Sequence, residues 1–291
     1  MHKEREPHKL ISVIIPMYNA ESVIGEQLEA LAAQTYEGDW EVVVADNRST
    51  DSSADVVRSY EDRIPALRLV EADERQGPGY ARNVGSRGAQ GDVILYADAD
   101  DVVSPDWMAA MAAALAEHDF VAGWSDPDGF ERPSHAPRPK PALQLPCSFG
   151  FLPWTVGGNC GIKAAVYAEV QGWNEEWPFG EDVDFSWRVQ LAGYPLVYVP
   201  EAVVNYRPRP TLTAMAKQQF KFGTRSPLLL REFEAFGATR RPLADVVRNW
   251  LWIVTRVPYA LIPNRRRTWV GNFAGSAGRI WGSLKWRKLS P

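Results

Sequence analysis

The sequence predicts an α/β fold in which a mostly parallel sheet is covered by helices on both faces. Apolar runs typical of buried strands alternate along the chain with segments whose apolar residues recur at helical spacing. Parallel strands need crossover connections, and the intervening helices provide them. A chain of 291 residues with 45% hydrophobic content is also long enough to bury a full core.

The alternation begins with a strand at residues 10–16 and a helix at 21–34, where apolar residues recur every three or four positions. It continues through strands at 40–45, 67–71 and 92–97 and helices at 52–60 and 78–89. Another helix is expected from Ser104 as N-cap, with Pro105 at its first position. Ligands of such sheets sit beyond the carboxyl ends of the strands, so the residues that follow each strand are the candidates for a site.

The second half of the chain is less regular. Residues 126–146 contain six prolines and little periodicity, which predicts a long irregular loop. Structured sequence resumes at Trp154, a strand is expected at 196–199, and a long helical pattern covers 211–236.

Acidic residues cluster after the apolar strand at 92–97. Asp98 and Asp100 are two positions apart, so in an extended backbone they point the same way. Oxygen ligands of this kind suit Mg²⁺ or Mn²⁺, and the cation would offset the repulsion between the carboxylates. The alternative is that Asp101 and a neighbour only begin a loop and cap a helix.

Five ordered motifs carry a resemblance to a known family. They are SVIIPMYN at 12–19, DNRSTD at 46–51, GPGYARNVG at 77–85, DAD at 98–100 and GEDVDFSWR at 180–188. In order and spacing they resemble family 2 glycosyltransferases of the GT-A fold, which have a Rossmann-like nucleotide-binding half. The resemblance implies an inverting enzyme that moves a sugar from a nucleotide diphosphate donor to a hydroxyl group.

The resemblance also implies roles for residues of this chain. Asp182 would be the catalytic base, and Asp100 would ligate a divalent metal, with Asp98 as a second ligand or a contact of the donor ribose. The nucleotide-sugar site would comprise Pro16, Tyr18, Asn19, Asp46, Asn47, Arg82, Asp98 and Ala99. The acceptor site would comprise Trp173, Asn174, Trp177 and Glu181, with core packing as the alternative for the two tryptophans.

Two acidic positions have simpler interpretations. Asp51 is expected only to cap the helix that follows it, and Asp184 to favour the dipole of its own helix.

Family members often carry a histidine after the strand that follows the base, whereas this chain has Asn205 and Tyr206 there. Because of this difference, strict metal dependence is the implication of the resemblance that the sequence supports least.

The charge of the chain is divided unevenly. From Arg240 onward there are 11 Lys and Arg and one acid, Asp245, a net charge of +10 that leaves −14 on the rest of the chain. Within this tail Trp269, Phe273, Ile280 and Leu284 recur at helical spacing, which is typical of an interfacial helix on anionic lipid. The alternative is a helix that packs on the protein through its glycines, Gly271, Gly275, Gly278 and Gly282. Nucleic acid is not an expected partner, because the body of the chain would repel phosphates.

These observations divide the chain into a flexible N-terminus at 1–9, a GT-A domain at 10–239 with an acceptor-side loop at 126–146, and a basic amphipathic tail at 240–291. The two cysteines, Cys147 and Cys160, have neither disulfide nor zinc-site spacing, and the N-terminus lacks the apolar core of a signal peptide. No stretch reaches the roughly 18 apolar residues of a membrane span. We therefore expect a cytoplasmic protein on the inner face of a membrane.

Three function classes follow from the sequence. The first is a metal-dependent glycosyltransferase that acts on a lipid-linked or polysaccharide acceptor, with UDP-, GDP- or dTDP-linked donors, and a homodimer is compatible with it. The second is a sugar nucleotidyltransferase, which a glycine-rich, lysine-containing loop after the first strand would favour, but residues 16–22 (PMYNAES) have neither feature. The third is a non-catalytic nucleotide-binding or membrane scaffold of the same fold.

Overall fold

A computed structural model describes residues 10–64, 66–130, 141, 144–177 and 179–288. The chain forms two compact units, one of Met1–Pro146 with Pro153–Arg207 and one of Cys147–Leu152 with Pro208–Pro291. The expected N-terminal segment at 1–9 and most of the proline-rich loop, at 131–140 and 142–143, lie outside the described residues.

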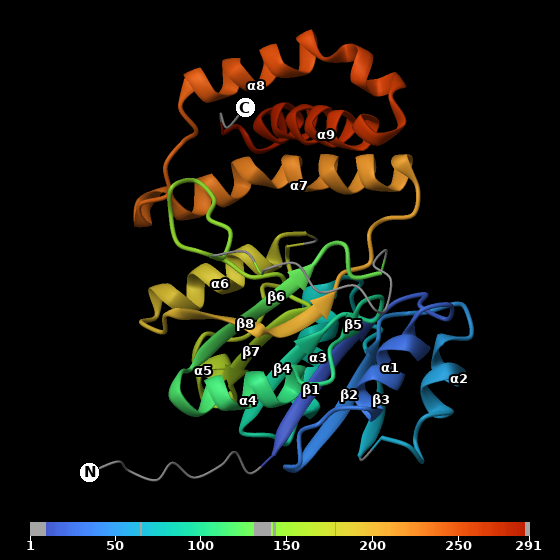
Figure 1. Ribbon diagram of the computed structural model, residues 1–291. Coiled ribbons are helices and arrows are strands. Elements are labelled where there is room, and N and C mark those ends of the chain that lie inside the picture. Colours follow the sequence, from blue (N-terminus) through green and yellow to red (C-terminus); the bar gives the residue numbers. More distant parts are fainter. Residues whose placement is uncertain (1–9, 65, 131–140, 142–143, 178, 289–291) are drawn as a thin grey trace. The chain divides into compact units, whose positions relative to one another are not determined.

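The first unit is built on a sheet whose described strands follow the order β3-β2-β1-β4-β7-β6-β8-β5 (Figure 1). The parallel half contains β1 (Ile11–Met17), β2 (Trp40–Asp46), β3 (Leu67–Glu71) and β4 (Val93–Ala97). The other half contains β5 (Val102–Val103), β6 (Phe120–Asp126), β7 (Asn159–Lys163) and β8 (Leu196–Asn205). There β7 runs antiparallel to both β4 and β6, whereas β6 and β8 are parallel.

Helices cover both faces of this sheet. Ile11, Val13 and Ile15 face a core shared with α1 (Ile24–Ala32), α2 (Ser53–Arg58) and α4 (Trp107–Glu117). Ile14, which points the other way, packs on the side of α3 (Pro78–Gly88), α5 (Ala164–Glu169) and α6 (Glu181–Leu191). The alternation of buried residues along β1 thus joins two apolar layers through one strand. The α/β fold with helices on both faces is confirmed.

Most elements lie where the sequence predicts them, and three details differ. β8 extends to Asn205, six residues beyond the expected strand, because it pairs with both β6 and β5. β5, β6 and β7 are strands that the sequence does not predict. The expected Ser104 cap is wrong, because α4 begins at Trp107 and the Ser104 carbonyl, rather than its side chain, accepts the Trp107 N–H at 3.0 Å.

The second unit is helical. It contains α7 (Leu212–Phe233), η1 (Glu234–Phe236), α8 (Leu243–Thr255), η2 (Val257–Leu261) and α9 (Pro263–Trp286). α9 lies between α7 and α8 (Figure 1). The first turn of α7 is capped by Thr211, whose side chain accepts the Ala214 N–H at 3.1 Å.

Glycines let α7 and α9 approach closely. A side chain at Gly278 or Gly282 would collide with the backbone carbonyl of Phe220 or Thr224, and one at Gly223 with that of Gly275. This is the packing alternative that the sequence left open for the tail. It also places α7 with the C-terminal helices, so the compact units divide after Arg207 rather than after the expected residue 239. No described helix has the length and apolar character needed to cross a membrane.

Candidate active site

Three carboxylates gather at the carboxyl end of β4. One ligand oxygen from each of Asp98, Asp100 and Asp101 lies within 4.8 Å of the others. Arg207 braces this turn, because its backbone N–H donates to Asp101 Oδ1 and its Nε donates to the Asp100 carbonyl, both at 2.8 Å. A cluster of hard oxygen donors with this spacing fits a divalent cation such as Mg²⁺ or Mn²⁺.

Arg82 of α3 joins this turn to the start of α6. Its Nη2 donates to Asp98 Oδ1 at 2.7 Å, and its Nη1 donates to Glu181 Oε1 at 3.0 Å. Burial acts to lower the pKa of Arg82, but Asp98 and Glu181 outweigh it and raise that pKa above its ordinary value. The guanidinium therefore stays charged and holds two carboxylates from distant parts of the chain on one group.

Cys160 shows that Asp182 belongs to the same neighbourhood. Burial raises the pKa of this β7 thiol to about 12; the charge of Arg82 opposes the rise, and those of Asp98 and Asp182 add to it. Both carboxylates are therefore close enough to act on one buried group. The Arg82 bridge brings an acid that follows β4, Asp98, together with the first residue of α6, Glu181.

The first turn of α6 positions Asp182. Gly180 precedes the helix with φ of 72°, a conformation that glycine adopts without strain. The Asp182 carboxylate accepts the Val183 N–H at 2.8 Å, and the Asp182 carbonyl accepts the Ser186 hydroxyl at 2.7 Å. The side chain is partly exposed, so solvent reaches it.

Asp184 has the structural role expected of it, through a specific ion pair. It is buried, and its Oδ2 accepts from Arg188 Nε at 2.8 Å. The other nitrogens of Arg188 donate to the carbonyls of Val170 and Gly172, both at 2.8 Å. This pair fixes the segment that leads into α6.

Five of the residues expected on the donor side, Pro16, Tyr18, Asn19, Asp46 and Asn47, lie at the ends of β1 and β2, whereas Arg82 is in α3 and Asp98 and Ala99 follow β4. Tyr18 is 52% exposed. The side-chain oxygen of Asn19 accepts the Thr50 N–H at 2.8 Å. Asp46 accepts the Ser49 N–H at 3.0 Å. The expectation that Asp51 only caps α2 is wrong, because Ser52 is the N-cap and Asp51 accepts the N–H groups of both Ser53 and Glu21 at 3.1 Å.

Asn47 differs from the rest of this set. Its side chain is buried, donates to the carbonyls of Ala72 and Arg75, and accepts the Gly77 N–H at 2.7 Å. Because these bonds occupy the amide, Asn47 shapes the loops around the strand ends rather than presenting its side chain to a ligand.

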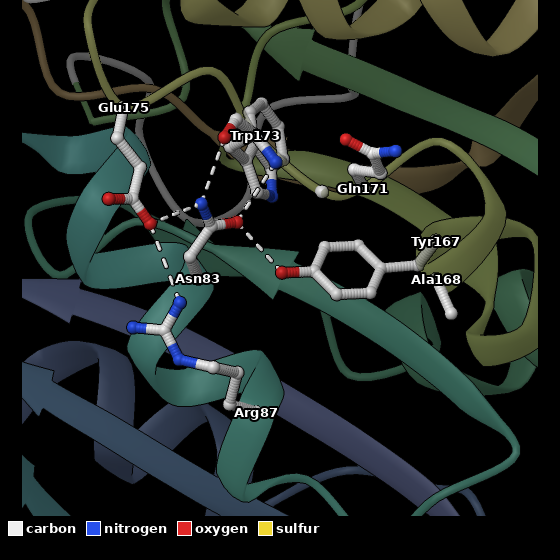
Figure 2. A pocket seen from close by; sticks show the side chains of 8 residues that line it. Asn83, Arg87, Tyr167, Ala168, Gln171, Trp173 and Glu175 are labelled. Carbon is white, nitrogen blue, oxygen red and sulfur yellow. Dashed lines mark hydrogen bonds and ion pairs between the residues drawn. The ribbon is translucent and has the colours of Figure 1, made fainter.

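Asn83 organises the segment before α6, as Figure 2 shows. Its Oδ1 accepts from the Tyr167 hydroxyl at 2.7 Å and from the Trp173 N–H at 2.9 Å. Its Nδ2 donates to the Trp173 carbonyl and to Glu175, both at 2.8 Å. A pocket of about 330 Å³ opens beside this hub, lined by Asn83, Arg87, Tyr167, Ala168, Gln171, Gly172, Trp173 and Glu175.

Most of the residues expected to bind the acceptor are buried or already paired within the protein. Trp173 is 2% exposed, its ring stacks on Phe185 at 4.1 Å between centroids, and the Arg82 guanidinium lies 4.9 Å from the ring centroid. The packing alternative therefore holds for Trp173, because a covered ring cannot stack on a sugar. Trp177 is 7% exposed, and Glu181 is engaged by Arg82. The side chain of Asn174, the remaining residue of the four, accepts the Glu176 N–H at 3.1 Å.

Two features of the site were not expected from the sequence. The pair Gly157–Gly158 presses against it, since a Cβ at Gly157 would lie 2.7 Å from the Arg82 guanidinium carbon and one at Gly158 would collide with the Asp98 carboxyl. Arg207 is the other. Adjacent glycines can mark a close approach, but nothing in the sequence names the partner.

Comparison with known proteins identifies the family. The model of "Glycosyl transferase family 2" matches residues 12–168, more than half of the chain. The chain belongs to this family. A second model, "Glycosyl transferase family group 2", matches residues 93–287.

Curated relatives are glycosyltransferases of differing length. Validoxylamine A glucosyltransferase of Streptomyces hygroscopicus subsp. limoneus is 29% identical over 230 residues, which are 66% of this chain and 50% of the relative. Glycosyltransferase AglE of Haloferax volcanii is 26% identical over 271 residues, 89% of this chain and 86% of the relative. The chain thus spans about half the length of the validoxylamine enzyme.

Solved structures of the family share the fold. Mannosyltransferase PcManGT from Pyrobaculum calidifontis, in complex with GDP-Man and Mn²⁺, aligns with a TM-score of 0.66 at 20% identity over 96% of this chain and 88% of that one. TarS residues 1–349 of S. aureus, in complex with UDP-GlcNAc, aligns with a TM-score of 0.58 at 19% identity over 96% and 92%. The GT-A fold implied by the sequence motifs is confirmed.

Proposed function

We propose that this chain is an inverting, metal-dependent glycosyltransferase that moves a sugar from a nucleotide diphosphate donor to a hydroxyl acceptor. The observation that carries the proposal is the Arg82 bridge, which ties Asp98 of the acidic turn to Glu181, the neighbour of Asp182. Through this bridge the candidate metal site at Asp98 and the residue next to the candidate base Asp182 are held by the same guanidinium.

Asp182 is assigned the role of general base. As the acceptor oxygen bonds to the anomeric carbon, the carboxylate takes the hydroxyl proton, and the bond from that carbon to the diphosphate oxygen breaks with its electron pair leaving on the diphosphate. One displacement of this kind inverts the anomeric centre. The exposed part of the side chain and its fixed place on the first turn of α6 support this assignment.

Asp100 is assigned as the main metal ligand, with Asp98 as a second. Asp101 offers the third oxygen of the cluster but is buried and tied to the Arg207 backbone, so we assign it to shaping the turn. A divalent cation held there supplies positive charge to the departing diphosphate. The Mn²⁺ in the PcManGT complex supports this choice of cofactor.

Donor binding is assigned to the ends of β1 and β2. We propose that Pro16, Tyr18, Asn19 and Asp46 contact the base and ribose, with the backbone at Ala99 beside them. Arg82 then acts through the carboxylates that it positions. The donors in the titles of related structures, GDP-Man and UDP-GlcNAc, support a nucleotide diphosphate sugar as the substrate class.

For the acceptor we propose a lipid-linked or polysaccharide glycan at the cytoplasmic face of a membrane. The support is the uneven charge of the chain, +10 from Arg240 onward against −14 elsewhere, together with the exposed apolar residues of the second unit. A basic, apolar unit attached to an acidic catalytic unit suits an enzyme whose acceptor is held in an anionic membrane.

A donor-binding screen tests the proposal. UDP-, GDP- and dTDP-sugars are added with and without Mn²⁺ while thermal unfolding is followed, and one donor at about 100 times its dissociation constant should stabilise by ~2.7 kcal/mol. The Asp100→Asn variant should lose the part of the stabilisation that depends on Mn²⁺.

Each other outcome bears on a named alternative. Stabilisation without sugar transfer or donor hydrolysis would favour the non-catalytic scaffold. Diphosphate release from a nucleoside triphosphate and a sugar phosphate would favour the nucleotidyltransferase. If none of the donors stabilises the protein, the proposal is contradicted.

A further inference from the structure

One face of α8 is apolar and exposed. Leu243, Val247, Leu251 and Val254 recur at intervals of four, four and three residues, so they lie along one side of the helix. Their exposed fractions are 74%, 49%, 59% and 65%. A soluble helix ordinarily buries such a stripe, and its exposure marks a surface that meets another apolar phase.

The opposite side of α8 is already used for packing on α9. Val246 and Ile253 are buried, Asn249 Nδ2 donates to Ser276 Oγ at 2.8 Å, and Trp269 Nε1 donates to the Ile253 carbonyl at 2.9 Å. α8 therefore has two apolar sides. One side packs on α9, and this packing holds the other, exposed side in place.

The exposed stripe continues into η2. Val257 is 53% exposed, Leu261 86% and Ile262 37%. We call these three residues and the four of α8 the α8–η2 face: Leu243, Val247, Leu251, Val254, Val257, Leu261 and Ile262.

Cations and aromatic rings flank the α8–η2 face. The Arg256 guanidinium lies 5.4 Å from the Trp252 ring centroid and 6.0 Å from that of Tyr259, and Arg265 lies 4.7 Å from Tyr259. Arg248 of α8 is also exposed and pairs with Asp245 at 2.8 Å. Aromatic rings paired with arginines on a segment that also exposes apolar residues are typical of the headgroup boundary of a bilayer.

The charge around the face selects an anionic surface. Arg265, Arg266 and Arg267 are all exposed at the start of α9, whose first turn has no acidic residue. Three cations at a helix N-terminus oppose the helix dipole, so an external anion would relieve the repulsion. In residues 240–291 the one acid is Asp245.

We propose that the α8–η2 face is the membrane-docking surface of this protein and that its partner is an anionic lipid bilayer. The inference rests on the membrane contact of the proposed function and assigns that contact to α8 and η2. The sequence pointed to Trp269, Phe273, Ile280 and Leu284 of α9. The rings of Trp269 and Phe273 stack on each other at 5.4 Å between centroids, and Phe273 also meets Trp250 of α8 edge-on at 6.4 Å.

Vesicle flotation with the full chain tests the proposal. Phosphatidylcholine vesicles with and without phosphatidylglycerol are mixed with the wild type, with Leu251→Glu/Val254→Glu, and with the matched control Ile280→Glu/Leu284→Glu. The control changes two exposed apolar residues of α9, 42% and 71% exposed, that lie outside the face.

Binding of the wild type should require phosphatidylglycerol. The Leu251→Glu/Val254→Glu variant should bind at least about tenfold more weakly, because two side chains no longer enter the apolar boundary, and the control should bind within about threefold of the wild type. Arg265→Gln/Arg266→Gln should weaken binding by about fivefold per arginine, with the loss reduced at high salt.

The outcomes separate the location from the membrane contact itself. If the wild type binds no vesicle, the proposed membrane contact fails. If the wild type binds and the control loses binding while the α8 variant keeps it, the α8–η2 face is the wrong location. If the α8 variant converts a dimer to a monomer without loss of vesicle binding, the face joins two copies of the chain and the proposal is overturned.

Discussion

Removal of the Arg82 guanidinium should destabilise the first unit strongly. In the Arg82→Met variant a chain of similar length remains, but the carboxylates of Asp98 and Glu181 lose the cation between them. The Glu181 side chain is 9% exposed and that of Asp98 33%. Breaking a buried ion pair costs about 3–5 kcal/mol, and because Asp98 reaches water we expect the lower end, about 3 kcal/mol.

Urea unfolding followed by tryptophan fluorescence, in buffer with EDTA, measures this loss. A second variant distinguishes charge from packing, since in Arg82→Met/Glu181→Gln one carboxylate instead of two has lost the guanidinium. It should recover about 1–2 kcal/mol relative to Arg82→Met. An Arg82→Met protein within about 0.5 kcal/mol of the wild type, or a double variant no more stable than the single one, would refute the reasoning.

Three further predictions concern packing, the hub before α6 and the buried thiol. Gly278→Ala should destabilise by about 2 kcal/mol, because the added methyl meets the α7 backbone, whereas Gly271→Ala, whose Cβ would lie 3.8 Å from its nearest neighbour, should be neutral or stabilising by up to about 1 kcal/mol; urea unfolding measures both. Asn83→Ala removes four hydrogen bonds and should cost about 2–4 kcal/mol by the same assay, and a loss below about 0.5 kcal/mol would contradict the hub. Between pH 9, the ordinary pKa of Cys160, and about 12, its pKa in the folded protein, the unfolded chain has lost a proton that the folded one keeps, so the free energy of unfolding should fall as pH rises. Cys160→Ala should show a smaller fall over that window, and an equal fall would count against the assignment.

The sequence predicts those parts of the fold that depend on local pattern. Strands β1 to β4 and their helices follow from apolar runs and helical spacing, and the acids after β4 follow from the rule that ligands gather at strand ends. β7 has no such signal. Its five residues, NCGIK, become a strand because β4 and β6 offer hydrogen-bonding edges on both sides. That environment is tertiary and leaves no periodicity in the sequence.

Residue roles set by distant contacts were the hardest to predict. Arg82 and Glu181 are 99 positions apart, so their pairing cannot be read from either motif alone. Trp173 looked equally suited to stacking on a sugar or packing in a core, and the position of Phe185 decides for the core. In the tail, the sequence offered both an apolar stripe and a row of glycines on α9, and the close approach of Gly278 and Gly282 to the α7 backbone shows that the glycines pack.

The function assigned to Asp182 is tested most directly by the Asp182→Asn variant, in which a carboxylate that can accept a proton becomes an amide of nearly equal size. With the nucleotide sugar identified by the donor screen, turnover is measured by nucleotide diphosphate release and donor affinity by calorimetry. We predict that turnover falls by about 10²–10⁴-fold while the dissociation constant of the donor stays within about threefold of the wild type. Turnover at the level of the wild type would contradict the assignment.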